Sequence, residues 1–372
     1  MSRAEDYRQM ARALRLAERG RYTTHPNPRV GCVLVKEGRR VGEGYHRRAG
    51  EPHAERNALA MAGVAARGAT AYVTLEPCCH QGRTPPCSDG LIEAGVSRVV
   101  VAMSDPNPLV AGQGIAQLRG AGIEVEEGLL REQAEALNPG FIRRMRGGRP
   151  WVRCKLAMSL DGRTAMASGE SRWISSDAAR RDVHRLRAAS AAILTGLGTL
   201  LADDPSMDVR LDQAGLGIDP DLPVPRPLRV VLDPELATPP GARMLGLPGQ
   251  TLILHAGGTP ARAAALHDAG AQLARVDGEG AGLALVQVLE LLGEREINEV
   301  LLETGATLAG AMLRAALIDE LIVYQAPHLM GDQARGLFHL PGLERMAERI
   351  PLEITDLRQV GPDIRITARL QE

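Results

Sequence analysis

Short apolar runs alternate with helix-like stretches over the first hundred residues, and this alternation restricts the fold more than any other feature. Residues 30–35 (VGCVLV) and 70–75 have the length and β-branched content of buried strands, and residues 53–62 between them have helical periodicity. Alternating strands and helices usually give parallel pairing, with crossover helices on the faces of the sheet. The sequence therefore predicts a layered α/β fold.

Further elements of the first half follow the same pattern. Tyr7, Met10, Ala11, Leu14 and Ala17 share one face of an expected helix that ends near Gly20. The other expected elements are a strand at 40–45 that pairs with 30–35 across Glu37-Gly38, a helix at 88–93 and a strand at 98–103.

A break in the apolar periodicity at residues 143–150 (RRMRGGRP) predicts a domain boundary. The length of 372 residues and the 44% of apolar residues suit two buried cores. We therefore predict one domain over residues 1–147 and a second over 148–372.

The second half also alternates between strand-like and helix-like segments, which predicts a second α/β domain. The loop expected at 211–227 contains four prolines. Strands are expected at 152–158, 191–195, 228–232, 251–254, 300–302 and 321–324, and helices at 177–189 and 281–292.

Charge and cysteine content exclude several classes of protein. The 44 Lys and Arg residues balance 45 Asp and Glu, so no cationic surplus favours a nucleic-acid partner. No apolar run reaches the roughly 18 residues of a membrane helix. Five unevenly spread cysteines make a poor disulfide framework. We expect a cytoplasmic protein without nucleic-acid or membrane partners.

Residue types that bind zinc occur in the first half at a characteristic spacing. His53-Ala54-Glu55 is followed by Pro77-Cys78 and then by Cys87. One His and two Cys are a set of three protein ligands that leaves a fourth zinc position open for water. Glu55 is then placed to transfer protons. The pattern matches the zinc-deaminase signature H-x-E then P-C-x-x-C, except that Cys87 follows Cys78 by nine positions instead of three.

Such a site predicts hydrolytic chemistry. Zinc lowers the pKa of bound water from about 15.7 to roughly 7, which supplies hydroxide at neutral pH. Glu55 would take a proton from that water and pass it to a departing amine. His53 and Cys87 are expected to begin helices, whose positive ends favour the thiolate and the hydroxide.

A structural zinc site, or no metal at all, is the alternative. A structural site closes with four ligands, and Cys79 or His80 could supply the fourth. Adjacent cysteines cannot easily face one ion, so we expect Cys79 to be a bystander. Cys32 and Cys154 lie in apolar strands and are expected to be core residues.

Longer motifs in this half resemble the bifunctional riboflavin-biosynthesis deaminase/reductase family. They are residues 25–31 (HPNPRVG), 50–55 (GEPHAE) and 74–87 (TLEPCCHQGRTPPC). The long spacing between the cysteines is the norm in that family, which usually has Ser or Asn at the position of Cys79. The resemblance implies a cytidine-deaminase-like α/β/α domain with zinc ligands His53, Cys78 and Cys87. It further implies that Glu55 is the catalytic proton carrier and that Asn27 binds substrate.

The second half alone is less decisive. Residues 195–199 (TGLGT) and 303–311 (ETGATLAGA) each follow an apolar strand, and small residues at such a turn let backbone amides approach phosphate. Simple turn glycines explain these segments equally well, and neither is the G-x-G-x-x-G fingerprint.

The resemblance continues through residues 155–165 (KLAMSLDGRTA), 169–174 (GESRWI), 201–205 (LADDP) and 303–311. It implies a dihydrofolate-reductase-like α/β domain that binds NADPH. The implied cofactor-binding residues are Ala157, Trp173, Thr199, Asp203, Gly305, Ala306, Thr307, Leu308, Ala309, Gly310 and Ala311. The implied substrate-binding residues are Ser171, Arg187, Met207, Arg210 and Glu303, the arginines being suited to a phosphate.

The implied function has two steps, with Zn²⁺ and NADPH as cofactors and a phosphorylated pyrimidine as substrate. Zinc-dependent deamination of 2,5-diamino-6-(5-phosphoribosylamino)pyrimidin-4(3H)-one precedes NADPH-dependent reduction of the ribosyl side chain to ribityl. We also expect a homo-oligomer. Alternatives are a nucleoside or nucleic-acid deaminase, and a second half that only binds ligands or assembles subunits.

Three positions of the second half need separate comment. Pro234 stands where the family commonly has a serine that holds the cofactor, so no hydroxyl contact is expected there. Asp208 replaces a common threonine near Arg210, and we expect its side chain to point outward. Lys155 either takes part near the reacting sugar or sits solvated at the end of a strand.

Overall fold

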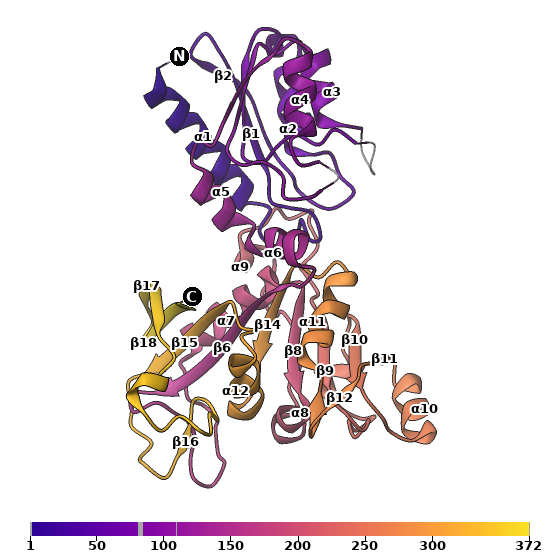
Figure 1. The fold of residues 1–372 in the computed structure, drawn as a ribbon, viewed down its shortest axis with the longest axis vertical. Helices are drawn as coiled ribbons and strands as arrows, with labels where there is room; N and C mark the ends of the chain where they lie inside the picture. Colours follow the sequence, from indigo (N-terminus) through magenta and orange to yellow (C-terminus); the bar gives the residue numbers. More distant parts are fainter. Residues whose placement is uncertain (1, 81–84, 109, 372) are drawn as a thin grey trace. The chain divides into compact units, whose positions relative to one another are not determined.

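The computed structural model describes residues 2–80, 85–108 and 110–371, which form two compact units (Figure 1). Unit 1 comprises Met1–Gly148 with Asp221–Pro223, and unit 2 comprises Arg149–Pro220 with Val224–Glu372. Gln81, Gly82, Arg83 and Thr84 of the long cysteine motif lie outside the described residues. Each unit has its own apolar core.

Unit 1 contains a mixed sheet with strand order β2-β1-β3-β4-β5. Its strands are β1 (Gly31–Lys36), β2 (Arg39–Tyr45), β3 (Thr70–Val73), β4 (Arg98–Val101) and β5 (Glu124–Glu127). Its helices are α1 (Arg3–Glu18), α2 (Ala54–Ala62), α3 (Cys87–Glu93), α4 (Gln113–Gly120), α5 (Arg131–Leu137) and α6 (Pro139–Gly147), with a 3-10 turn at Gly63–Ala66. Helices α1 and α5 lie on one side of the sheet, and α2, α3 and α4 lie on the other (Figure 1).

The prediction of parallel pairing is only partly right. Strands β3, β4 and β5 are parallel, and the predicted hairpin of β1 with β2 is confirmed, but β1 also pairs antiparallel with β3. The crossover helix α2 leaves from β2, and the hairpin partner β1 occupies the place between β2 and β3. The helix α2 therefore connects two strands, β2 and β3, that run in the same direction, as expected for a crossover connection. The two strands are not neighbours in the sheet.

The segment from residue 113 to 147 contains elements that the sequence analysis did not anticipate, namely α4, β5, α5 and α6. The basic residues expected to interrupt the periodicity lie in the last turns of α6, which ends at Gly147. The helical structure ends only at Gly148, the C-cap of α6. Its φ of 69° is a left-handed conformation suited to glycine.

Unit 2 is built on a long sheet with strand order β11-β10-β9-β8-β14-β6-β15-β18-β17. All neighbours from β11 to β15 are parallel, and β18 and β17 add antiparallel pairs. The strands of this sheet are β6 (Trp151–Ser159), β8 (Ala192–Gly196), β9 (Leu228–Leu232), β10 (Thr251–His255), β11 (Gln272–Arg275), β14 (Glu299–Glu303), β15 (Glu320–Ala326), β17 (Leu352–Val360) and β18 (Asp363–Leu370).

Helices and short strands make up the rest of unit 2. The helices are α7 (Asp177–Ala189), α8 (Leu197–Asp203), α9 (Gln213–Leu216), α10 (Pro260–Asp268), α11 (Leu285–Glu294) and α12 (Ala306–Arg314), and 3-10 turns occur at Arg243–Gly246 and Met346–Glu348. Two small ribbons pair β7 (Arg163–Ala165) with β16 (Arg335–Gly336), and β12 (Gly278–Glu279) with β13 (Gly282–Leu283).

Most strands predicted for this half lie within two residues of observed ones, and α7 spans the predicted range. The helix expected to begin at residue 281 begins at Leu285, because β13 occupies the preceding residues. The expected loop at 211–227 contains the short helix α9. The C-terminal pair β17 and β18 was not anticipated. Among the described residues, no helix combines the length and apolarity that a membrane crossing requires.

Candidate active sites

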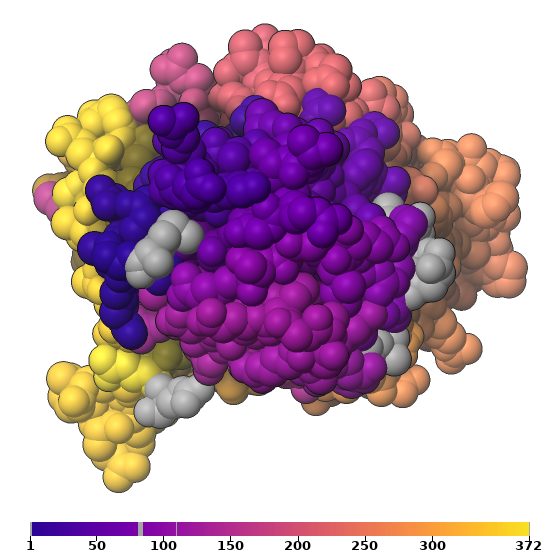
Figure 2. Space-filling view, turned by 90° about the horizontal axis from the view of Figure 1, so that it is seen from above, coloured from indigo at the N-terminus to yellow at the C-terminus, as the bar shows by residue number. Residues whose placement is uncertain are grey.

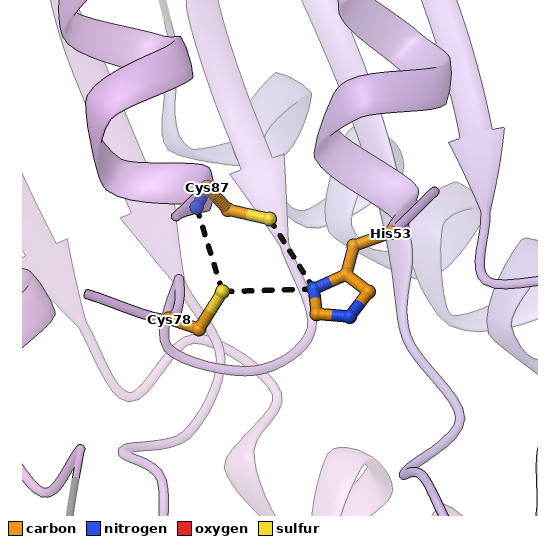
Figure 3. A group of neighbouring side chains, drawn as sticks. All are labelled: His53, Cys78 and Cys87. Atoms are coloured by element: carbon orange, nitrogen blue, oxygen red, sulfur yellow. Dashed lines mark hydrogen bonds between the residues drawn. The ribbon is translucent and has the colours of Figure 1, made fainter. Parts of the chain in front are cut away.

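His53, Cys78 and Cys87 converge in unit 1 (Figure 3). Their ligand atoms all lie within 4.8 Å of one another. The Nδ1 atom of His53 is 3.6 Å from Cys78 Sγ and 3.4 Å from Cys87 Sγ. As expected from the sequence, His53 is the N-cap of α2 and Cys87 is the first residue of α3. Cys78 comes from the loop after β3.

Close backbone packing determines where α2, and with it His53, can lie. A Cβ atom on Gly42 would lie 2.2 Å from the carbonyl oxygen of Ala58, and one on Gly44 would lie 2.4 Å from that of Ala54. Both distances are far shorter than van der Waals contact, so only glycine allows α2 to approach β2 this closely. The two glycines of β2 therefore allow α2 to pack at the position where it presents His53.

The start of α3 holds the Cys78 ligand. The backbone N–H groups of Cys87 and Ser88 donate to the Cys78 carbonyl at 3.0 and 3.2 Å, and the Cys87 N–H also faces Cys78 Sγ at 3.4 Å. These are N–H groups that a helix leaves without an intrahelical partner. Hydrogen bonds with Cys87 and His53 lower the pKa of the Cys78 thiol, which favours the thiolate that binds metal.

Glu55 is 3% exposed and lies in the first turn of α2. Burial, reinforced by the nearby Cys78, raises the pKa of its carboxyl group to about 7. A carboxyl group with such a pKa can both accept and release a proton near neutral pH. Its contact with Cys87 places it beside the group of three donors.

The donor set fits a catalytic zinc ion better than a structural one. Among the described residues, the converging group contains one imidazole and two thiolates, which is the number that leaves a coordination position open. Cys79 and His80 are not part of that group. Cys32 and Cys154 are fully buried in β1 and β6, as expected for core residues.

Asn27 is held beside this site by a residue that the sequence analysis missed. Its Nδ2 atom lies 3.0 Å from Nε2 of His46, and Nδ1 of His46 lies 3.3 Å from the carbonyl oxygen of Pro52. Burial lowers the pKa of His46 to about 4, so the ring is neutral. A neutral ring that donates from Nδ1 accepts from Asn27 at Nε2. The His46 ring also packs edge-on against His53, with centroids 5.1 Å apart.

Glu76 is a second residue whose role the sequence did not reveal. This buried carboxylate precedes Pro77-Cys78 and accepts backbone N–H bonds from Asp105, Gly112, Gly114 and Ile115 at 2.9–3.3 Å. It therefore ties the ligand loop to the start of α4. The sequence shows that Glu76 is close to the ligand Cys78. It does not show the hydrogen-bond donors of Glu76, which lie 29–39 residues further along the chain.

A second group of polar side chains lies in unit 2, where parallel strands end. Lys155 on β6 and Glu303 on β14 are register partners. Arg187, near the end of α7, donates two hydrogen bonds to Glu303 at 2.6 and 2.9 Å. Burial alone would raise the pKa of Glu303, but Arg187 outweighs it and lowers that pKa to about 2. Burial lowers the pKa of Lys155, and Glu303 opposes the shift.

Two helices begin at the carboxyl ends of the neighbouring strands β8 and β14. Gly305 is the N-cap of α12, and its backbone N–H donates to Oγ1 of Thr199 in α8 at 3.2 Å. Exposed backbone at the start of a helix is suited to a phosphate group. Gly305 and Thr307 are exposed, and Ala306 and Leu308 are half-buried.

The end of the expected cofactor segment has different surroundings. Ala309 is fully buried, and a Cβ atom on Gly310 would lie 2.1 Å from the carbonyl oxygen of His339. Ala311 is half-buried. The structure thus places the beginning of α12, and not its middle, at the accessible strand ends. Ala157 lies near the end of β6, where its register partner is Tyr324 of β15.

Most of the remaining predicted residues come from loops, and Asp203 ends α8. Trp173 is 71% exposed and stacks on Arg180 of α7, and the neighbouring Arg172 bonds to the backbone carbonyl of Asp203. Ser171 is half-buried in the same loop. Met207 is 2% exposed in the core, where its backbone has a left-handed φ of 47°.

The expectation that Asp208 points outward is wrong. Its Oδ1 atom is buried and lies 3.4 Å from Nε of Arg210 and 3.9 Å from Nη1 of Arg187. Its backbone carbonyl accepts from Arg187 at 3.0 Å, and the ring of His184 lies at 3.2 Å from the same oxygen. Attraction to two guanidinium groups compensates for the cost of burying the acid.

Comparisons with known proteins agree with this arrangement. The model of the RibD C-terminal domain matches residues 150–366, and that of the cytidine and deoxycytidylate deaminase zinc-binding region matches residues 3–103. The riboflavin biosynthesis protein RibD of Escherichia coli is 53% identical over 363 residues, which cover 97% of this chain and 98% of that protein. The Haemophilus influenzae protein of the same name is 49% identical, covering 96% and 95%.

Solved structures extend the similarity to the fold. Acinetobacter baumannii RibD (form 1) has a TM-score of 0.89 at 44% identity, and the match covers 99% of both chains. A Thermotoga maritima diaminohydroxyphosphoribosylaminopyrimidine deaminase/5-amino-6-(5-phosphoribosylamino)uracil reductase has a TM-score of 0.84 at 31% identity, again over 99% of both chains.

The fold and the two families of matching domain define a zinc-dependent deaminase joined in one chain to an NADPH-dependent reductase. The expected fold class and cofactors are thereby confirmed. The chain belongs to the RibD family of bifunctional riboflavin-biosynthesis enzymes, in which a deaminase step is followed by a reductase step.

Proposed function

We propose that residues 1–147 carry out the deamination and residues 148–372 the reduction. The first substrate is 2,5-diamino-6-(5-phosphoribosylamino)pyrimidin-4(3H)-one, and the deaminated product is then reduced from ribosyl to ribityl with NADPH. The substrate assignment is supported by the activity for which the Thermotoga maritima relative is named. The division is supported by the zinc donor set, which lies wholly within the first segment, and by the strand-end site within the second.

In the deaminase site, His53, Cys78 and Cys87 would hold the zinc ion. When bound, zinc lowers the pKa of a bound water towards about 7. Glu55 accepts a proton from the attacking water and delivers it to the departing amine, for which its raised pKa is suited. Asn27 uses its second amide hydrogen and its carbonyl oxygen to bind the pyrimidine, because His46 engages only one of its hydrogens.

In the reductase site, NADPH supplies the hydride and the protein supplies orientation. The exposed start of α12 and the Oγ1 atom of Thr199 support a phosphate-binding role there. The proposed cofactor residues are Ala157, Trp173, Thr199, Asp203, Gly305, Ala306, Thr307 and Leu308. Ala309, Gly310 and Ala311 belong to the same expected segment but lie in the middle of α12, away from the accessible strand ends. The proposed substrate residues are Ser171, Arg187, Met207, Arg210 and Glu303.

The convergence of three zinc donors beside a buried carboxyl group carries the deaminase proposal, and Glu55→Gln tests it. Removing the proton carrier is expected to slow ammonia release by roughly 10²–10⁴-fold. NADPH oxidation with previously deaminated substrate should be retained. Glu51→Gln, a nearby carboxylate paired with Arg48, is the matched control. Ammonia release near the wild-type rate in Glu55→Gln would refute the proton-carrier role.

We further propose a homo-oligomer. The C-terminal strands are yellow in the space-filling view (Figure 2), and they carry exposed apolar side chains. Patches of this kind mark protein contacts. Sedimentation of the wild type and of Ile354→Lys tests the proposal, since a monomeric wild type would refute it. The apolar residues are Leu352, Ile354, Leu357 and Ile364, which are 39–63% exposed.

The cytoplasm is the proposed compartment, and we propose that nucleic acid is not a partner. All five cysteines are free, which suits a reducing compartment. The net charge of -1 gives no general attraction to a polyanion. Absence of retention on immobilised DNA and RNA at low salt is the expected result.

A further inference from the structure

Asp208 has a place in the reductase site that the two-step function does not explain. Its carboxylate lies between Arg187 and Arg210, the two arginines proposed to receive the substrate phosphate. Oδ1 of Asp208 is buried and has no hydrogen-bond donor among the described residues. A buried carboxylate oxygen without a donor is costly, so its position is maintained by the surrounding positive charge.

The guanidinium groups near Asp208 are already engaged with carboxylates. Arg187 is committed to Glu303 through two hydrogen bonds and to the Asp208 carbonyl through a third. Arg210 is 64% exposed at its side chain, and Asp208 is the acid that approaches its Nε atom. Arg210 is therefore the cation that an incoming phosphate can reach from solvent.

The charges of this cluster do not match a phosphate dianion. Lys155, Arg187 and Arg210 contribute cations, while Glu303 and Asp208 contribute anions, and burial keeps His184 largely neutral. A dianion entering beside Arg210 must approach the Asp208 carboxylate or displace it from the arginine. Like charges at such short range weaken binding.

We propose that Asp208 is a specificity-determining residue of the reductase site that competes with the substrate phosphate for Arg210. This inference rests on the proposed phosphate-binding role of Arg187 and Arg210. Asp208 raises the KM for the phosphorylated substrate above the value that the arginines alone would give. It also limits occupation of the site by free inorganic phosphate.

The neutral, nearly isosteric variant Asp208→Asn tests this proposal in the full-length enzyme. The backbone carbonyl that bonds Arg187 is kept, so the loop is expected to fold, and Asp208→Thr provides a second neutral variant. In both variants the KM for the deaminated pyrimidine phosphate should fall about tenfold, equivalent to about 1.4 kcal/mol, with a smaller change in kcat. The inhibition constant of inorganic phosphate against NADPH oxidation should fall in parallel.

Two controls separate the effect on phosphate from other effects. The dephosphorylated substrate should show no comparable change in KM, because it lacks the group with which Asp208 competes. Asp268→Asn removes an exposed carboxylate from the same unit and should leave every constant at its wild-type value. An unchanged or raised KM for the phosphorylated substrate in Asp208→Asn, or an equal gain for both substrates, overturns the proposal.

The Arg210→Ala variant tests separately whether the substrate phosphate binds at Arg187 and Arg210. If Arg210→Ala leaves both the KM for the phosphorylated substrate and phosphate inhibition unchanged, the phosphate does not bind at these arginines. If Arg210→Ala weakens both but Asp208→Asn has no effect, the arginine assignment stands and only the role of Asp208 is wrong.

Discussion

The two candidate sites are built from different kinds of residues and surroundings. Two of the three zinc donors of unit 1, His53 and Cys87, lie at the starts of helices, and the proton carrier Glu55 is 3% exposed. The site of unit 2 collects charged side chains from strands, from α7 and from loops, and Arg210 among them is open to solvent. The first site is compact and its ligand types are specified by a short motif, whereas the second depends on long-range ion pairs.

This difference predicts how each site fails. In unit 1, metal chemistry depends on individual atoms, so loss of one donor should abolish activity with limited damage to the fold. In unit 2, the charges balance one another, so removal of one should disturb both binding and stability.

His53→Ala should have the largest effect, namely loss of bound zinc and of ammonia release. Two thiolates alone leave the ion with too few protein ligands. Metal analysis of the purified protein and an ammonia assay check this. NADPH oxidation with deaminated substrate is the internal control. Full zinc occupancy in the variant would contradict the assigned ligand set.

Glu303→Gln should destabilise unit 2. Arg187 and Glu303 are only 12% and 15% exposed, and breaking a buried pair costs about 3–5 kcal/mol. Urea unfolding followed by a probe in unit 2 measures the change, with the exposed Glu294→Gln as matched control. Deamination should be unaffected. An unfolding free energy equal to that of the wild type would show that this pair is not stabilising.

The same pair predicts a pH dependence. Arg187 outweighs the effect of burial and lowers the pKa of Glu303 from 4.5 to about 2, so the stabilisation is complete above the unfolded value and is lost as pH falls through 2. A shift of this size corresponds to about 3 kcal/mol. The difference in unfolding free energy between wild type and Glu303→Gln should therefore shrink between pH 4.5 and 2. A constant difference would contradict this account.

Glu76→Gln should have an intermediate effect. The amide keeps one acceptor oxygen but presents N–H groups to backbone donors, so bonds worth about 1.5–3 kcal/mol each to a charged acceptor are weakened. We expect lower thermal stability of unit 1 and weaker zinc retention against a chelator. Glu93→Gln on α3 serves as a control. Unchanged zinc retention would separate Glu76 from the ligand loop.

Cys79→Ser should have the smallest effect. Cys79 lies outside the group of converging donors, so zinc content and ammonia release should stay at wild-type levels. Stability should change by less than about 0.5 kcal/mol, as for most substitutions away from special features. A loss of zinc would make Cys79 a ligand and would revive the four-ligand structural site.

The sequence alone determined the ligand types, the α/β class and most strands. His53, Glu55, Cys78 and Cys87 were identified because metal chemistry restricts both residue type and local spacing. Strands such as β9 and β10 were predicted because burial on both faces produces continuous apolar runs.

Only the tertiary structure decided the positions that depend on distant partners. Four contacts join residues that no local pattern links. They are the antiparallel pairing of β1 with β3, the bond between Asn27 and His46, the anchoring of distant backbone by Glu76, and the approach of Asp208 to Arg187. Local periodicity records which face of an element is buried, but not which charge lies opposite. For Asp208, the surrounding arginines compensate for burial, and this balance of energies exists only in the folded chain.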